Sequence, residues 1–278
     1  MDMKTTIAYL AFFALLFSCA TNPFTGKKTL KLPGTENSTL IPAAFAQYNE
    51  VLSDSKIVKG TPDAEMINRV GKRIANAAER WLNANGYQAY LEDYDWEYTL
   101  IESEQVNAWC LPGGKIAFYT GILPIAENET GVAIIMGHEV AHALANHGQQ
   151  RMSKGMLQQL GAGAVAAASS SETAQEQQLY MAAYGLASTY GFMMPYSRKH
   201  ETEADKIGLI LSAIAGYNPE EGAKLWERMK ANSGGEAPPE FMSTHPSNDT
   251  RIQTLQKMAD QAKTEAEKFG VTSFRPIN

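Results

Sequence analysis

Two histidines in the middle of the chain have the spacing of a metal site. They lie four residues apart in His138-Glu139-Val140-Ala141-His142. A helix has 3.6 residues per turn, so two imidazoles at this spacing lie on one face and can share one zinc ion. The Glu139 carboxylate beside them can take a proton from a zinc-activated water. The pattern predicts hydrolysis of an amide bond, with one Zn²⁺ per chain.

A third zinc ligand must come from elsewhere, because a catalytic zinc keeps three protein ligands and one open position. The metzincin pattern does not supply it, since the position of its third histidine is Gly148 in this sequence. The best candidate is Glu201, which shares one face of a predicted helix with Asp205. One carboxylate can bind zinc, and the other can accept the remaining ring N–H of a ligand histidine.

Three further polar residues near these motifs are predicted to face solvent. His147 lies at the end of the predicted helix, where we interpret it as a solvated cation near the negative end of the helix dipole. Glu203 lies about 200° around its helix from Glu201, so we expect it and the neighbouring His200 to be exposed.

The order of these motifs along the chain is similar to that of a known family. The HExxH segment is followed by Ser-Arg-x-x-Glu-x-x-Ala-Asp at residues 197–205, and further matches lie at residues 107–114 and 244–252. Together they resemble family forty-eight of the metallopeptidases, over about residues 61–252. That family includes the CAAX prenyl proteases, the HtpX-like proteases and periplasmic lipoprotein proteases.

The resemblance implies a role for each matched residue. It implies that the zinc ligands are His138, His142 and Glu201 and that Glu139 is the base. Asp205 would lie behind the ligands and orient one of them. The resemblance also implies that an exposed strand edge aligns the substrate backbone by main-chain hydrogen bonds. The residues of that edge would be Asn107, Ala108, Trp109 and Cys110.

His245 and Arg251 belong to the last matched segment, and two roles stay open for His245. It could stabilise the oxyanion that forms when water attacks the scissile carbonyl, in which case its removal would lower the rate. It could instead occupy the open zinc position in a resting enzyme, in which case its removal would raise the rate. We favour the second role. Arg251 is expected to hold the His245 loop or the substrate carbonyl.

The N-terminus has the features of a lipoprotein signal. Lys4 precedes an apolar run at residues 7–17, which is too short to span a bilayer, and Leu16-Phe17-Ser18-Cys19 resembles a lipobox. We expect a signal peptide at residues 1–18, an acylated Cys19 that anchors the protein to a membrane, and a tether at residues 19–34. The alternatives are an ordinary signal peptide that contains a cysteine, or a buried core segment.

The expected location follows from this signal. Ala20 replaces the Asp that retains lipoproteins in inner membranes, which favours the bacterial outer membrane, facing the periplasm. In a Gram-positive cell the same signal would indicate the plasma membrane. Acylation of Cys19 would leave Cys110 unpaired, and we expect Cys110 to be a small apolar residue on a strand rather than a nucleophile.

Composition limits the class of protein. The chain has 278 residues, of which 44% are hydrophobic, and its net charge of -6 argues against a nucleic-acid partner. After the signal, no run reaches the ~20 apolar residues of a membrane span. We expect one α+β, predominantly helical domain at residues 35–278, with a small sheet and the HExxH motif on a helix. The family resemblance implies that this domain has a gluzincin-like zincin fold.

Periodicity and turn signals give the elements of that domain. The Ala- and Gly-rich segment 155–170 could be a mobile helix, a membrane-touching flap or a tightly packed core helix, and we favour the last. Strands are expected at residues 96–101, 106–111 and 115–119, and helices at residues 36–56, 61–85, 128–147, 174–191, 197–215, from 218 onward, and 248–269.

These features together predict a zinc-dependent endopeptidase. Its substrates would be misfolded or extended polypeptides of the cell envelope, cleaved in protein quality control at a bacterial membrane. The alternative is a chaperone-like lipoprotein that binds unfolded chains with little proteolysis, although the intact Glu139 is more than binding requires. The sequence makes no prediction of the oligomeric state.

Overall fold

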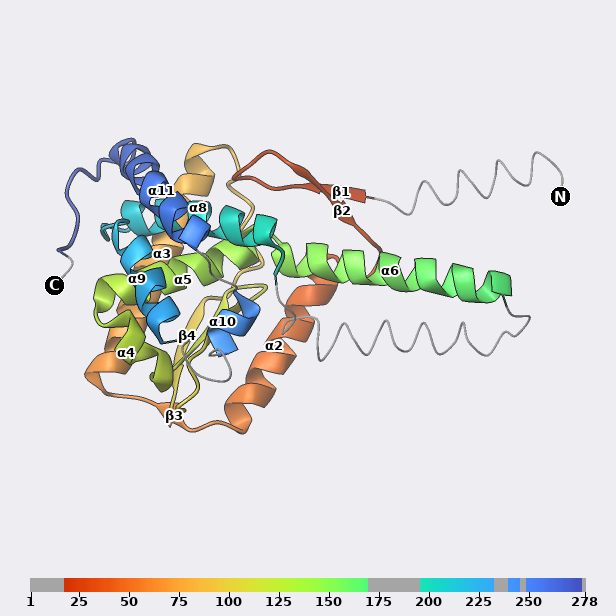
Figure 1. The fold of residues 1–278 in the computed structure, drawn as a ribbon, viewed down its shortest axis with the longest axis horizontal. Coiled ribbons are helices and arrows are strands. Elements are labelled where there is room, and N and C mark those ends of the chain that lie inside the picture. The colour runs from red at the N-terminus through yellow and green to blue at the C-terminus, as the bar shows by residue number, and fades with distance from the viewer. Residues whose placement is uncertain (1–17, 170–195, 233–239, 246–248, 277–278) are drawn as a thin grey trace.

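The computed structural model describes residues 18–169, 196–232, 240–245 and 249–276. Helices make up most of this part of the chain, and they surround a small four-stranded sheet (Figure 1). The predicted α+β, mainly helical class is therefore confirmed. The helix expected at residues 174–191 lies outside the described residues.

The sheet has the strand order β3-β4-β6-β5. β4 (Glu97–Ile101) and β6 (Lys115–Tyr119) are parallel, whereas β3 (Ile57–Val58) and β5 (Ala108–Leu111) pair antiparallel with them. The predicted turn at residues 112–114 joins β5 to β6, and its two glycines have positive φ, which a residue with a Cβ rarely adopts. β5 is thus an edge strand.

Two long helices precede the site. α2 (Asn37–Ser53) packs near β5 and β6, and α3 (Pro62–Ala84) packs against α5 and β4. The Thr61 hydroxyl caps α3 by accepting a hydrogen bond from the Ala64 N–H at 3.2 Å, and Pro62 takes the first helical position, as the sequence predicted.

α5 (Glu129–Leu144) carries the HExxH motif through the centre of the molecule. Every side chain from its second residue onward is buried, because α3, α8, α9 and the sheet enclose it. The Asn128 side chain caps it by accepting from the Gly131 N–H at 2.9 Å. The helix was predicted to continue to His147, but it ends at Leu144, and Asn146 turns the chain with a φ of 54°.

α8 (Arg198–Ile214) carries the carboxylate motif and packs directly on α5. α11 (Asp249–Glu267) and α9 (Glu221–Ala231) cover these two helices. Shorter elements connect the layers: η1 (Thr120–Ile122), α4 (Leu123–Ala126) and α10 (Glu240–Thr244). The sequence did not predict α10, which has a single turn and immediately precedes His245.

The segment expected to be an irregular tether contains a β-hairpin. β1 (Ser18–Thr21) pairs antiparallel with β2 (Lys28–Lys31), with Cys19 opposite Leu30. The turn between them is anchored to the domain, because the Phe24 ring stacks on Trp81 with ring centroids 4.2 Å apart.

α6 (His147–Ser169) leaves the body of the domain and runs beside the β1-β2 hairpin (Figure 1). Of the segment 155–170, which we interpreted as a core helix, the described side chains at residues 155–158 are half-buried or exposed, so that part does not lie in the core. An Ala- and Gly-rich helix with weak amphipathicity resembles a core helix in sequence, so the pattern could not separate the two. Among the described helices, none has the length and apolar character needed to cross a membrane.

Candidate active site

The crossing of α5 and α8 sets the positions of the site residues that these two helices carry. Gly137 and Gly208 let the two helix backbones approach closely, since a Cβ on Gly208 would lie 2.7 Å from the His138 backbone nitrogen. Glu201 and Asp205 precede Gly208 on the same face of α8. The crossing therefore presses both carboxylates against the histidine face of α5.

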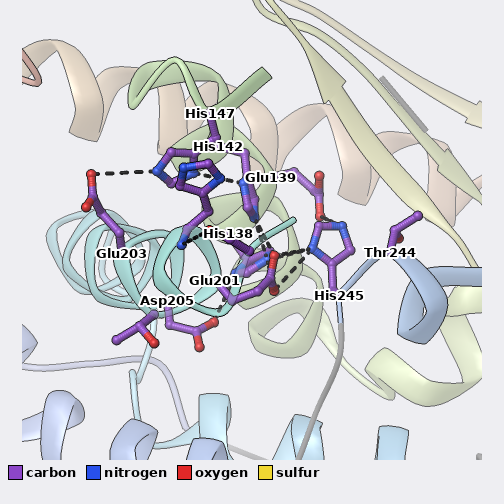
Figure 2. Close-up of polar contacts among 12 residues, drawn as sticks. His138, Glu139, His142, His147, Glu201, Glu203, Asp205, Thr244 and His245 are labelled. Atoms are coloured by element: carbon purple, nitrogen blue, oxygen red, sulfur yellow. Dashed lines mark hydrogen bonds and ion pairs between the residues drawn. The ribbon is translucent and has the colours of Figure 1, made fainter. Parts of the chain in front are cut away.

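Four buried side chains direct ligand atoms toward one another: His138, His142, Glu201 and His245 (Figure 2). The His138 Nε2 lies 3.0 Å from the His142 Nε2 and 3.2 Å from the His245 Nδ1. The Glu201 Oε1 lies 3.3 Å from the His142 Nε2 and 3.1 Å from the His245 Nδ1. Zinc bonds of about 2.0–2.1 Å in a tetrahedron place ligand atoms roughly 3.3 Å apart. The four donors therefore fit a tetrahedral zinc ion.

Asp205 and Arg251 contact the side of this group that faces away from the ligand atoms. The Asp205 Oδ1 lies 3.0 Å from the His138 Nδ1, the ring nitrogen that points away from the other donors. Arg251 binds both Asp205 oxygens, at 2.8 and 2.7 Å, and its Nη1 lies 2.8 Å from the Glu201 Oε2. Burial would raise the pKa of Asp205, but Arg251 and His138 hold it below its usual value. Asp205 therefore stays ionised and orients His138.

Glu139 is buried on the side of the group that faces His245, with its Oε1 3.3 Å from the His245 Nε2. Burial raises the pKa of its carboxyl, against the opposing effect of His245 and His138. A carboxylate with a raised pKa is a stronger base. Its location beside the ligands suits a residue that moves a proton rather than one that binds metal.

The short helix α10 and its backbone contacts hold His245 in the group. The Phe241 N–H donates to the Val106 carbonyl at 3.1 Å, and the His245 N–H donates to the Phe241 carbonyl at 2.8 Å. The Arg251 Nη1 lies 3.4 Å from the His245 carbonyl oxygen. Arg251 thus contacts the backbone of the His245 segment as well as Glu201 and Asp205.

The predicted exposure of His147 was wrong. Its side chain is fully buried, and its Nδ1 lies 2.9 Å from the His142 Nδ1. The prediction assumed one helix through residue 147, whereas the left-handed Asn146 ends α5 and starts α6 at His147. The turn directs the imidazole toward the site instead of toward solvent.

Glu203 and His200 were also predicted to be exposed, and both are partly covered. The Glu203 side chain is 12% exposed, and its Oε1 lies 3.6 Å from the His147 Nε2. His147 and Lys27 hold the pKa of Glu203 at about 2 despite partial burial. The His200 ring stacks on His147 with centroids 4.4 Å apart. α6 and the β1-β2 hairpin cover this part of α8, and neither contact was evident from helical phase.

Tyr196 is a site residue that the sequence did not reveal. Its ring stacks on His142 with centroids 3.9 Å apart, and the Arg151 guanidinium lies over the Tyr196 ring at 4.1 Å. Its N–H donates to the Thr244 carbonyl, next to His245. Tyr196 lies outside both recognised motifs, so no spacing pattern pointed to it.

The four residues of the predicted substrate edge lie on or next to β5. Asn107, Ala108 and Cys110 are buried, and Trp109 is half-buried. β5 pairs with β6 on one side only, so its other edge ends the sheet. Burial raises the pKa of the Cys110 thiol well above its usual value, as expected for a small apolar residue rather than a nucleophile.

With this geometry established, comparison with known proteins identifies the family. A model of Peptidase family M48 matches residues 65–259, which include all the donors described above. The chain belongs to peptidase family M48. The predicted family, the peptidase class and the zinc requirement are thereby confirmed, since the donor group has the composition and spacing that zinc needs.

Three proteins with known names are similar in sequence to this M48 chain. It is 33% identical to the mitochondrial metalloendopeptidase OMA1 of Schizosaccharomyces pombe over 79% of this chain and 61% of the relative. It is 28% identical to the human metalloendopeptidase OMA1 over 91% of this chain and 49% of the relative. It is 26% identical to the β-barrel assembly-enhancing protease of Escherichia coli over 72% of this chain and 39% of the relative. The M48 chain spans less than two thirds of these relatives.

The comparison corrects the predicted location. We expected a bacterial outer-membrane protein facing the periplasm, but the similar proteins from two yeasts, a plant and humans are named as mitochondrial metalloendopeptidases. The prediction took the lipobox-like signal as bacterial and chose the outer membrane from one residue, Ala20, whose meaning depends on a particular bacterial sorting system. A single position in a leader cannot establish that such a system is present.

Proposed function

We propose that this M48 peptidase is a zinc-dependent endopeptidase that cleaves extended or unfolded polypeptides in protein quality control. The observation that carries the proposal is the convergence of His138, His142 and Glu201 beside a buried carboxylate, Glu139. Three ligands and a base are the minimum that a catalytic zinc peptidase needs. The names of the relatives, which include metalloendopeptidases, support the same activity.

Each residue of the site has a defined part in this mechanism. Zinc, when bound, supplies a Lewis acid that polarises the scissile carbonyl and acidifies a water molecule. Glu139 takes the proton from that water and delivers it to the leaving amide nitrogen. Burial raises the pKa of Glu139, which makes its carboxylate a stronger base for the first of these transfers. Asp205 and Arg251 are positioning residues, because they hold His138 and Glu201 in place.

We propose that the substrate backbone aligns along the free edge of β5. An extended peptide can add to an edge strand through main-chain hydrogen bonds, which depend little on its sequence. β5 ends the sheet and packs against the HExxH helix α5, which supports an edge next to the site. A folded domain cannot offer such a strand, so unfolded segments are the expected substrate class.

The test is cleavage of reduced, alkylated casein by the purified full chain, with a native folded protein as the control substrate. We expect cleavage of casein that a chelator abolishes and Zn²⁺ restores, and little cleavage of the folded protein. Binding of casein without cleavage at full zinc occupancy, by the unmodified chain and by His245→Ala alike, would support the chaperone-like alternative and contradict the proposal.

We further propose that His245 acts as a fourth ligand that keeps the enzyme latent. Its Nδ1 lies 3.1 to 3.2 Å from two ligand atoms, where the open position of a tetrahedral zinc would be. Its Nε2 faces Glu139 at 3.3 Å, so His245 in this position also separates the base from a substrate. Movement of α10 would then open the site.

His245→Ala, assayed on casein, distinguishes the two roles of this residue. A latency ligand predicts a higher rate, because water and substrate gain the fourth position. A stabiliser of the oxyanion predicts a loss of about 10²-fold or more. A loss of that size, or an unchanged rate at every pH, would contradict the latency proposal.

We also propose that Cys19 is acylated and attaches the peptidase to a membrane. The sequence Leu16-Phe17-Ser18-Cys19 supports the modification, and removal of residues 1–18 would keep the pairing of Cys19 with Leu30. The test is incorporation of a fatty-acid label in the source organism by the full chain and by Cys19→Ser. Label in the full chain alone supports the proposal, and equal label in both, or none in either, contradicts it.

A further inference from the structure

His142, the second zinc ligand, has an outer contact that differs from the one behind His138. The His138 Nδ1 faces a carboxylate, Asp205, directly, whereas the His142 Nδ1 faces another imidazole, His147, at 2.9 Å. A ligand histidine usually donates its second ring N–H to a carboxylate, carbonyl or water, which fixes the tautomer and the ring orientation. For His142, that acceptor is His147 (Figure 2).

The geometry determines the tautomer of each ring. His142 must keep its Nε2 free of a proton to bind zinc, so its proton lies on Nδ1 and is donated to the His147 Nδ1. A neutral His147 that accepts at Nδ1 carries its own proton on Nε2. The nearest carboxylate oxygen in the described structure is the Glu203 Oε1, 3.6 Å from the His147 Nε2. If these two atoms move slightly closer, hydrogen bonds connect His142 through His147 to the Glu203 carboxylate.

The turn of the β1-β2 hairpin fixes the outer end of this chain. The Lys27 Nζ lies 3.0 Å from the Glu203 Oε2, and the Asn22 side-chain amide donates to the Glu203 Oε1. The turn is held on the domain by the stack of Phe24 on Trp81. Both oxygens of the Glu203 carboxylate are therefore bound by residues that are far away in sequence. An acidic side chain whose only role is to face solvent does not require such contacts.

We propose that His147 and Glu203 are positioning residues for the zinc ligand His142, and that Lys27 and Asn22 of the hairpin turn hold this chain in place. The proposal rests on the zinc-binding role of His142. It gives the two ligand histidines separate supports: Asp205 with Arg251 for His138, and His147 with Glu203 for His142. It also connects the N-terminal hairpin to the metal site.

The test is the zinc dissociation constant of the purified full chain, measured by competition with a zinc-binding dye. Contacts of this kind usually contribute about 10- to 100-fold to metal affinity. We expect His147→Leu to weaken zinc binding by ~10- to 100-fold and His147→Asn, which keeps an acceptor near the Nδ1 position, to weaken it less. Glu203→Gln should weaken zinc binding in the same direction, because it removes the charge and keeps the shape.

A double-mutant cycle separates positioning from general destabilisation. If the two residues act in series, the double variant His147→Leu, Glu203→Gln should bind zinc no more weakly than His147→Leu alone. Glu102→Gln is the matched control, since it removes an exposed carboxylate paired with Lys56 at 2.7 Å, and its zinc affinity should be unchanged. The melting temperature of each metal-free variant is measured in parallel.

Three results would overturn the proposal: zinc affinity of Glu203→Gln and His147→Leu within twofold of the unmodified chain, additive losses in the double variant, or losses matched by a lower metal-free melting temperature. Should His147→Leu fail to fold, Glu203→Gln and Lys27→Met, which change partly exposed side chains, still decide the question. A peptidase that binds zinc but cleaves no casein would contradict the proposed function and leave this measurement valid.

Discussion

Gly137 of α5 and Gly208 of α8 lie against each other where the two helices cross. A Cβ on Gly137 would be 2.7 Å from the Gly208 carbonyl oxygen, and a Cβ on Gly208 would be 2.7 Å from the His138 backbone nitrogen. The histidines of α5 and the carboxylates of α8 face each other next to this contact. The distance between the candidate metal ligands of α5 and of α8 therefore depends on the absence of two side chains.

Gly208→Ala should separate the helices and weaken the metal site. An added methyl group in a tightly packed contact costs about 1–3 kcal/mol of stability, and here it also displaces Glu201 and Asp205 from α5. Chemical unfolding and zinc titration measure both effects. Gly155→Ala on α6 is the control, because its Cβ would meet nothing within 4 Å, so stability should be equal or higher. Equal behaviour of the two variants would contradict the role of the crossing.

Asp205→Asn should fold and bind zinc about 10- to 100-fold more weakly. The amide keeps an acceptor for the His138 Nδ1–H but loses the charge that Arg251 holds at 2.7 and 2.8 Å. The control is Asp249→Asn, which changes an exposed carboxylate near the start of the helix that carries Arg251. Zinc affinity equal in the two variants would show that Asp205 is only a packing residue.

The Cys110 thiol should resist labelling in the folded protein. It is buried, and burial raises its pKa well above the usual value, so little reactive thiolate forms near neutral pH. In a Cys19→Ser chain, a thiol reagent should react with Cys110 at least ~10²-fold faster in denaturant than under native conditions. Rapid labelling of the native chain would show that Cys110 is accessible and that its surroundings differ from those described.

The ion pairs at the start of α5 should make stability depend on pH. Burial would raise the pKa of Glu129, but Arg69, Tyr217 and Arg73 hold it below the ordinary value of 4.5. A carboxyl whose folded-state pKa is lowered stabilises the fold above its unfolded pKa, and this contribution is lost as the pH falls below 4.5 toward the lowered value. Glu129→Gln should therefore lose about 1 kcal/mol at pH 7.

Chemical unfolding at a series of pH values tests this prediction. The difference between the unmodified chain and Glu129→Gln should shrink as the pH is lowered from 5 through the folded-state pKa. A difference that stays constant over this range would assign the effect to hydrogen bonds alone. Glu220→Gln, at an exposed pair with Lys263, is the control and should change stability by no more than a few tenths of a kcal/mol.

Part of the group of candidate metal ligands could be predicted from sequence because its geometry is local. His138 and His142 share a helix face by spacing alone, and Glu201 and Asp205 do so on a second helix. The outer support of His142 was not predicted, because it depends on a helix break at Asn146. Asn is, after Gly, a residue that often adopts the left-handed conformation at a helix end, so Asn146 was the signal that could have revealed the break. One left-handed residue moved His147 from the predicted surface to the centre of the site.

Long-range pairing explains the other differences. β3 has only two residues and forms because β4 offers it an edge, so Ile57–Val58 carries little strand signal of its own. The β1-β2 hairpin lies in a segment whose Pro and Gly content is typical of a tether, and the stack of Phe24 on Trp81 anchors its turn. Periodicity predicted the long helices, because their pattern extends over many residues. The β5-β6 hairpin was predicted because its sequence includes the turn itself.

The most direct test of the account is the rate at which zinc-loaded Glu139→Gln cleaves unfolded casein, compared with the unmodified chain at equal zinc content. The substitution keeps the size of the side chain and leaves His138, His142 and Glu201 as ligands, so zinc occupancy and fold should not change. We expect the rate to fall by at least ~10²-fold, because the base that moves the proton is lost. A rate within a few fold of the unmodified chain, with zinc bound, would contradict the assignment of Glu139 and the mechanism built on it.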